Sequence, residues 1–116
     1  MSEATEQAKI VRRLRHARIL FCHVPNGLEV TERAKRNLAR QGLRPGVPDL
    51  LIFTPPPGRP GAVGTALEMK TTARGSALRE NQKEWLANLS GCGWATIVGW
   101  GAEDALEKLR ALGYDL

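Results

Sequence analysis

The chain has 116 residues, which is enough for one hydrophobic core and too few for two. Its composition, 42% hydrophobic and 25% charged, is that of an ordinary globular domain, and no apolar run approaches the roughly 20 residues that span a bilayer. We therefore expect a single domain over residues 1–116 that does not cross a membrane. The net charge of +5 favours a phosphate-rich partner without proving one.

The N-terminal residues are polar and acidic and lack the apolar segment of a secretory leader. The two cysteines, Cys22 and Cys92, fit neither a disulfide framework nor a metal cluster. Both lie among apolar residues, so we expect them to be buried free thiols. These features predict a protein of the reducing cytoplasm.

The first half of the chain predicts a helix, a strand and a second helix. Residues 3–17 carry apolar side chains at helical spacing, and the apolar run 19–24 has the length of a strand. Thr31 can cap a helix that ends near Gly42. Arginines and lysines crowd both helices, either as contacts for an anionic partner or as the solvated faces of amphipathic helices.

Two further strands are expected over 49–53 and 65–71, joined by a connection rich in proline and glycine. The unbroken apolar character of the first suggests that it is buried on both faces. The connection is short, so the two strands can pair antiparallel.

The last third of the chain predicts a helix, a strand and a helix. Ser76 can cap a helix that runs to about Ser90, and a buried strand over 94–100 precedes a helix over 104–112. A helical crossover allows the 94–100 strand to run parallel to its neighbour. The whole is an α/β domain with a mixed central sheet flanked by helices, in the order αβαββαβα.

Three charged residues lie on the two central strands. Side chains two apart on a strand share a face, so Glu68 and Lys70 project together while Met69 points away. If Asp49 lies beside them, two carboxylates can hold a divalent cation and the lysine can stabilise charge on a phosphate. The alternatives are a turn aspartate after proline and an exposed ion pair between Glu68 and Lys70.

Gln82 falls on an apolar face of the third expected helix, which it shares with Leu78, Trp85 and Leu89. A buried amide needs hydrogen-bond partners. The partner is either a nearby backbone carbonyl or a group at the site: a substrate phosphate, a water or one of the carboxylates.

Glu3 projects near the centre of the apolar stripe of the first helix, and Glu6 falls well off it. An inward glutamate in a first turn can reach the mouth of a site. The alternative is an acidic residue favoured by the helix dipole. Which of Glu3 and Glu6 joins the site stays open.

Six stretches then carry a resemblance that covers nearly the whole chain: Ser2-Glu3 with Gln7, His23-Val24-Pro25-Asn26-Gly27, Gly46-Val47-Pro48-Asp49-Leu50, Leu67-Glu68-Met69-Lys70, Gln82-Lys83-Glu84-Trp85-Leu86 and Gly91-Cys92-Gly93. With these motifs the chain resembles the virus-type replication-repair nuclease (VRR-NUC) domain of the PD-(D/E)XK superfamily. The resemblance implies a restriction-endonuclease-like core. It also implies a metal-dependent DNA endonuclease, like phage or bacterial proteins that act on branched DNA such as four-way (Holliday) junctions.

The resemblance also implies roles for the site residues. Mg²⁺ or Mn²⁺ would be bound by Asp49, Glu68 and the backbone carbonyl of Met69, with Glu3 nearby. Lys70 would position or activate water. Support for the site would come from Gln82. We expect no small-molecule cofactor besides the metal.

Four residues could contact DNA phosphates beside the site: Asn26, Lys35, Arg44 and Arg74. Trp100 could stack on a base or pack in the core. Resolution of a junction requires two symmetric cuts, so a homodimer is expected for that substrate. The alternatives are a non-catalytic nucleic-acid-binding module that retains the fold, and a flap or sequence-specific nuclease.

Overall fold

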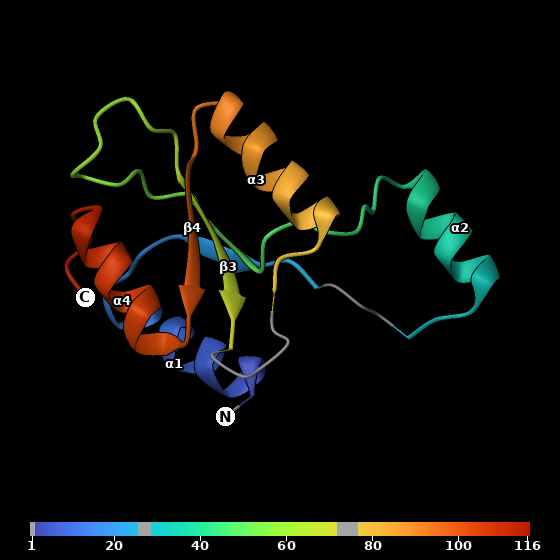
Figure 1. Ribbon diagram of the computed structural model, residues 1–116, viewed down its shortest axis with the longest axis horizontal. Helices are drawn as coiled ribbons and strands as arrows, with labels where there is room; N and C mark the ends of the chain where they lie inside the picture. Colours follow the sequence, from blue (N-terminus) through green and yellow to red (C-terminus); the bar gives the residue numbers. More distant parts are fainter. Residues whose placement is uncertain (1, 26–28, 72–76) are drawn as a thin grey trace.

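The computed structural model describes residues 2–25, 29–71 and 77–116. Figure 1 shows a central sheet with helices around it. The elements, in chain order, are α1 (Glu3–His16), β1 (Phe21–His23), α2 (Glu32–Arg40), β2 (Leu50–Ile52), β3 (Thr65–Lys70), α3 (Glu80–Gly91), β4 (Ala95–Trp100) and α4 (Ala102–Ala111). The predicted α/β class and the element order are confirmed. Of the helices described, none is long and apolar enough to cross a membrane.

The four strands form one sheet in the order β1-β2-β3-β4. β2 is antiparallel to both β1 and β3, whereas β4 runs parallel to β3 after the α3 crossover, as predicted. All six residues of β3 are buried, because this strand has a neighbour on each side and helices over both faces. Any residue that β3 carries is therefore held rigidly.

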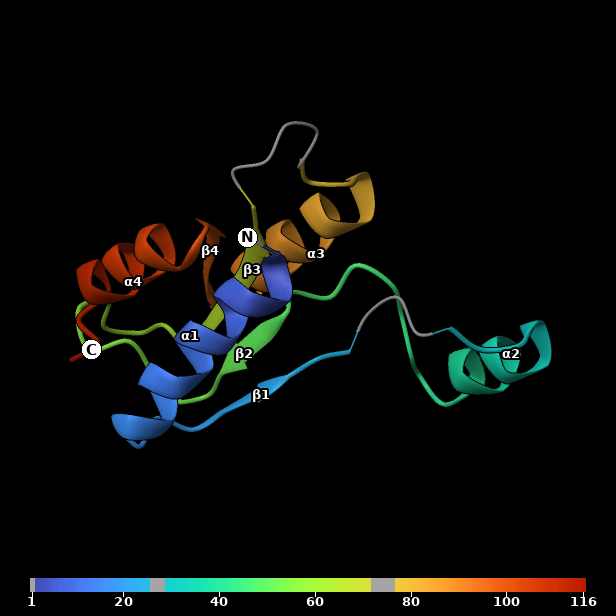
Figure 2. The ribbon, with the colours of Figure 1, turned by 90° about the horizontal axis from the view of Figure 1, so that it is seen from below.

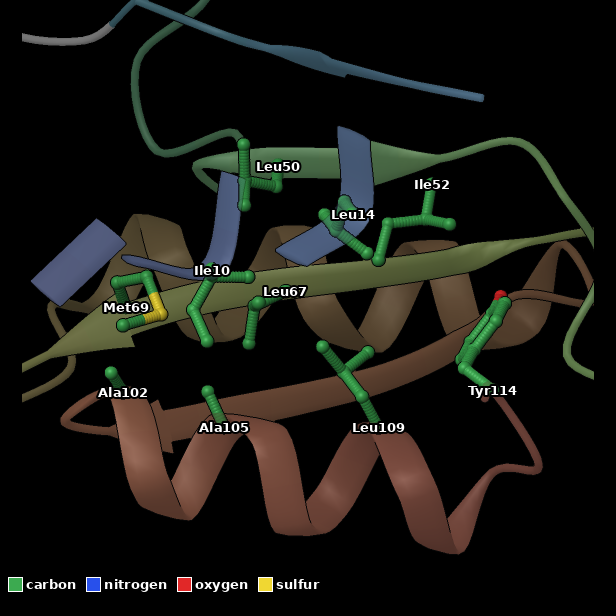
Figure 3. Packing of buried hydrophobic residues seen from close by; sticks show 10 residues of the cluster. All are labelled: Ile10, Leu14, Leu50, Ile52, Leu67, Met69, Ala102, Ala105, Leu109 and Tyr114. Carbon is green, nitrogen blue, oxygen red and sulfur yellow. The ribbon is translucent and has the colours of Figure 1, made fainter. Parts of the chain in front are cut away.

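The hydrophobic core lies between the sheet and the helices α1 and α4. Figure 2 shows α1 crossing one face of the strands with α4 beside it. Ile10 and Leu14 of α1 meet Leu67 and Met69 of β3, and Leu109 enters from α4 (Figure 3). The alternation of side chains along β3 then turns Glu68 to the opposite face, toward α3.

Two expectations about the last third of the chain differ from the structure. Ser76 lies outside the described residues, and α3 begins at Glu80, so Leu78 precedes the helix instead of sharing its face. The helix starts there because the Gln82 side chain accepts the N–H of Arg79 at 2.9 Å and satisfies a free amide of the first turn.

The prediction that both cysteines are buried is wrong: Cys22 and Cys92 are exposed free thiols. Cys22 belongs to β1, which forms an edge of the sheet and is poorly covered. Cys92 follows the last residue of α3, where the helix has left the core. The apolar neighbours of each cysteine in the sequence therefore did not predict its exposure.

Helix α2 stands apart from the rest of the molecule in both views (Figures 1 and 2). Thr31 caps it as predicted, since its Oγ1 accepts the N–H of Ala34 at 3.1 Å. None of its nine residues is buried. A helix this short is only marginally stable in water unless it packs against other elements. The contacts described for α2 therefore stabilise it little.

We predict that Tyr114→Phe lowers the free energy of unfolding by about 1–3 kcal/mol in a denaturant titration. The Tyr114 hydroxyl donates to the carbonyl of Thr54 at 2.6 Å and lies 2.9 Å from Oγ1 of Thr65, and the phenylalanine would leave both groups unsatisfied. Thr65→Val is the partner in a double-mutant cycle, where the double variant should lose less than the sum. Strict additivity would contradict the shared bond.

Candidate functional site

Asp49 and Glu68 lie side by side where β2 begins. Leu50 pairs with Leu67 across the antiparallel ladder, which puts the preceding and following residues, Asp49 and Glu68, at the same level. Asp49 Oδ2 accepts the backbone N–H of Met69 at 2.8 Å. The Asp49 side chain also lies close enough to Glu68 to raise the pKa of its carboxyl group. The expected convergence of the two acids is therefore present.

Glu68 and Lys70 are buried, with 2% and 7% of their surface exposed. They therefore do not form the exposed ion pair that was one alternative. Burial raises the pKa of Glu68 to about 9, helped by the hydrogen bond and the charge of Asp49 and by the charge of Glu3, while the charge of Lys70 acts in the opposite sense. Glu68 therefore holds its proton at neutral pH, which is the behaviour expected of a carboxyl group buried beside a second one.

Gln82 binds the site directly. Its Nε2 donates to Glu68 Oε1 at 3.2 Å, and its Oε1 accepts the N–H of Arg79. Of the partners that the sequence allowed for the Gln82 amide, the one found in the structure is a carboxylate of the site. The amide is only partly buried, because no residue of α3 is fully covered. The interaction fixes one oxygen of Glu68 against the first turn of α3.

The loop before Asp49 is pressed against α3, and this contact explains its glycine. Gly46 has φ 92°, and a Cβ at this position would lie 2.9 Å from Asn81 of α3. Trp85 donates from Nε1 to the carbonyl of Pro45 at 3.0 Å. A larger residue at position 46 would therefore displace the loop that delivers Asp49.

Gln7 and His23 hold the backbone of Asp49 from the other side. His23 Nδ1 lies 3.0 Å from the carbonyl oxygen of Asp49 and 3.0 Å from Nε2 of Gln7. The same carbonyl accepts the N–H of Val24 at 2.9 Å. No role was predicted for these two side chains from the sequence. His23 lies within an apolar run and Gln7 on a polar helix face, so neither has an identifiable partner in the sequence. Their contact appears only when β1 and α1 pack together.

A hollow of about 590 Å³ opens at this end of the sheet, and Glu3, Gln7, His23 and Asp49 contribute to its lining. Glu3 is exposed there and its charge reaches Glu68. Glu6 instead accepts the N–H of Ala102 at 3.2 Å and pairs with Lys9 at 2.7 Å, a contact that lowers its pKa. The geometry thus favours Glu3 over Glu6 as a neighbour of the carboxylate pair.

Of the four expected phosphate contacts, the structure describes two, Lys35 and Arg44, and neither lines the hollow beside Asp49. Lys35 lies on the outlying helix α2, where it pairs with Glu32 at 3.4 Å. The Arg44 guanidinium stacks 4.7 Å above the ring of Trp85. Asn26 and Arg74 fall outside the described residues. The expectation that Lys35 flanks the site is therefore not met, because the sequence did not show that α2 leaves the sheet.

The residues present fit a hard divalent cation. Met69 donates its N–H toward Asp49, and the N–H and C=O of one strand residue face the same neighbouring strand, so its carbonyl also faces Asp49. The resulting donors are all oxygens. The described residues hold no cluster of three or more His, Cys, Asp or Glu side chains. Two carboxylates supplemented by a carbonyl and water suit Mg²⁺, which keeps several waters in proteins.

Comparisons with known proteins agree with this picture. A family model described as the VRR-NUC domain matches residues 1–103, a range that includes every candidate site residue. A solved structure described as a VRR_NUC domain protein shares the fold, with a TM-score of 0.75 and 20% identity over 98% of this chain and 88% of that one. No curated protein matches the chain in sequence.

We predict that the metal-free protein loses stability as the pH rises from about 5 to about 9. The raised pKa of Glu68 means that the folded state holds a proton that the unfolded state releases above its ordinary pKa of 4.5. The free energy of unfolding in EDTA should therefore fall by up to about 1.4 kcal/mol per pH unit, the limit for one proton. Glu68→Gln should flatten this slope.

Glu84→Gln, on the exposed side of α3, is the matched control and should keep the wild-type slope. Mg²⁺ should raise the melting temperature of the wild type at about pH 8, and not that of Glu68→Gln. If Glu68→Gln kept the wild-type dependence of unfolding free energy on pH, the raised pKa of Glu68 would be refuted.

Proposed function

Because the chain belongs to the VRR-NUC domain family, a nuclease-type family, we propose that it is a metal-dependent endodeoxyribonuclease. The observation that carries the proposal is the position of Asp49 opposite Glu68 across the β2–β3 ladder, with buried Lys70 on the same strand. Two acidic side chains brought together inside a protein destabilise it on their own. A divalent cation held between them would offset that cost.

Asp49, Glu68 and the carbonyl of Met69 would hold Mg²⁺ or Mn²⁺. The cation supplies positive charge that stabilises the phosphate as it is attacked. Gln82 keeps one oxygen of Glu68 occupied by its 3.2 Å hydrogen bond and so limits how the carboxylate turns toward the cation. The hydrogen bond from the Met69 N–H to Oδ2 does the same for the Asp49 carboxylate.

Lys70 shares its strand face with Glu68, so its ammonium lies on the same side of β3 as the acid. In this position it orients the water that attacks the phosphodiester in line and stabilises the charge that develops. The hollow that Glu3, Gln7, His23 and Asp49 help to line gives the DNA strand access to the site. Hydrolysis of a DNA phosphodiester is the reaction that these groups support.

We propose that the enzyme works as a homodimer on branched DNA, such as a four-way junction, since a two-fold pair of sites can make symmetric cuts. Helix α2 supports this proposal because none of its residues is buried in the structure as described. Leu38 and Ala34 lie on one side of it and are half-covered, whereas Arg36 and Arg40 lie on the other and are exposed. The flanking side chain of Leu43 is 39% exposed. The apolar side of α2 would pack against the second copy.

We predict metal-dependent cleavage of a labelled four-way junction, measured on gels beside flap, splayed-arm and duplex DNA. Lys70→Met should lower the cleavage rate by about 100-fold or more, because it removes a group that stabilises developing charge. DNA binding, measured by anisotropy, should remain. Asp49→Asn should abolish both cleavage and the stabilisation by Mg²⁺.

Lys83→Met is the matched control, since Lys83 is an exposed lysine of α3 that pairs only with Glu80 in the described structure. It should cleave as the wild type does. A wild type that binds these DNAs and leaves all of them intact in Mg²⁺ and Mn²⁺ would instead identify a non-catalytic binding module.

We predict that Leu43→Asp shifts the protein from dimer to monomer in sedimentation at micromolar concentration, because a charge cannot be buried in the α2 contact without a large cost. Leu20→Asp is the control: Leu20 is 67% exposed and precedes β1, away from α2. It should leave the dimer intact. A wild type that is monomeric at this concentration would exclude the contact and favour single cuts at a flap.

A further inference from the structure

A large aromatic residue ends the strand next to the candidate site. Trp100 pairs with Lys70 in the parallel ladder, and paired residues project from the same face of a sheet. Its backbone is fixed, because the N–H donates to Asp104 Oδ2 at 2.9 Å. Its side chain is nevertheless 37% exposed. Of the two readings of Trp100 from the sequence, complete burial in the core is therefore excluded.

Trp100 borders a second hollow, of about 600 Å³, between α1 and the start of α4. This volume lies in the range of small-ligand sites, about 300–1,000 Å³. Arg12 lines this hollow and also the one beside Asp49. Trp100 itself lies on the strand next to Lys70, two residues along β3 from Glu68, so a DNA strand held at the carboxylate pair passes close to Trp100.

The lining of the second hollow is positive. Lys9 offsets Glu6, with which it pairs at 2.7 Å, and this leaves Arg12 and Arg13 against Glu103. Both arginines are exposed, and neither forms an ion pair with any residue that the structure describes. Free guanidinium groups next to an indole ring suit a partner with both negative charge and flat aromatic groups.

We propose that this hollow receives an unpaired nucleotide of the DNA strand whose phosphodiester lies at Asp49 and Glu68. Its base stacks on the indole of Trp100, and its flanking phosphates bind Arg12 and Arg13. Base pairs within a duplex hide their faces, so only an unstacked base can make this contact. The inference rests on the proposed nuclease function and narrows its substrate to DNA with unpaired bases next to the cut.

The test uses single-stranded and duplex oligonucleotides that carry one 2-aminopurine, whose fluorescence falls when it stacks. Binding is measured in Mg²⁺ with the full chain carrying Lys70→Met to stop cleavage. Adding Trp100→Ala should remove the quenching and weaken binding of the single strand about 10-fold, with little change for the duplex. Trp100→Phe, which keeps a ring, should retain most of both effects.

Arg13→Ala separates charge from stacking: it should weaken the single strand and the duplex alike. Arg59→Ala, an exposed arginine on the loop between β2 and β3, is the control for lost charge and should bind as its parent does. Equal quenching and equal affinity with and without Trp100 would overturn the proposal. So would a Trp100→Ala variant that only dissociates the dimer, because Trp100 would then contact the second copy.

These outcomes are independent of the catalytic proposal. Cleavage without any effect of Trp100 would refute the stacking site and leave the nuclease standing. Stacking in a protein that cleaves no DNA would refute the nuclease and retain the binding site.

Discussion

The hydrogen bond from the Met69 amide to the Asp49 carboxylate is the contact on which the candidate site depends. β3 pairs with β2 only over residues 65–67, while it continues beside β4 to Lys70. The last residues of β3 would therefore present unpaired amides to the side where β2 is missing. The carboxylate of Asp49 takes the place of the absent strand there. One side chain thus completes the sheet and brings an acid to the level of Glu68.

This arrangement sets stability against reactivity. Glu68 occupies the most buried strand of the protein, where an apolar residue would be more stable, and its raised pKa expresses that cost. Gln82 and Lys70 compensate it in part, one by a hydrogen bond and the other by charge. The part of the burial cost that these two groups do not offset is the part that a bound cation would relieve. Burial by rigid neighbours also holds the acids in place, which a surface cluster would not do.

The sequence predicted the layers of the fold because each layer has its own periodicity. The apolar runs, the antiparallel β2–β3 pair and the parallel β4 are present, and Asp49 meets Glu68 as the register requires. Local pattern could not show which strand forms an edge, so the exposure of Cys22 was missed. It also could not show that α2 leaves the sheet, since an amphipathic helix looks the same whether its partner is its own chain or another. The roles of Gln7 and His23 depend on contacts between elements that are distant in sequence.

Both ends of the excursion that carries α2 are anchored at Asp49. The chain leaves the sheet after His23 and returns to it at Leu50, and at this crossing the carbonyl of Asp49 accepts the N–H of Val24. The residue whose carbonyl ties the returning chain to the outgoing one is thus the residue whose carboxylate faces Glu68, so the segment that carries α2 and the carboxylate pair share one attachment to the sheet.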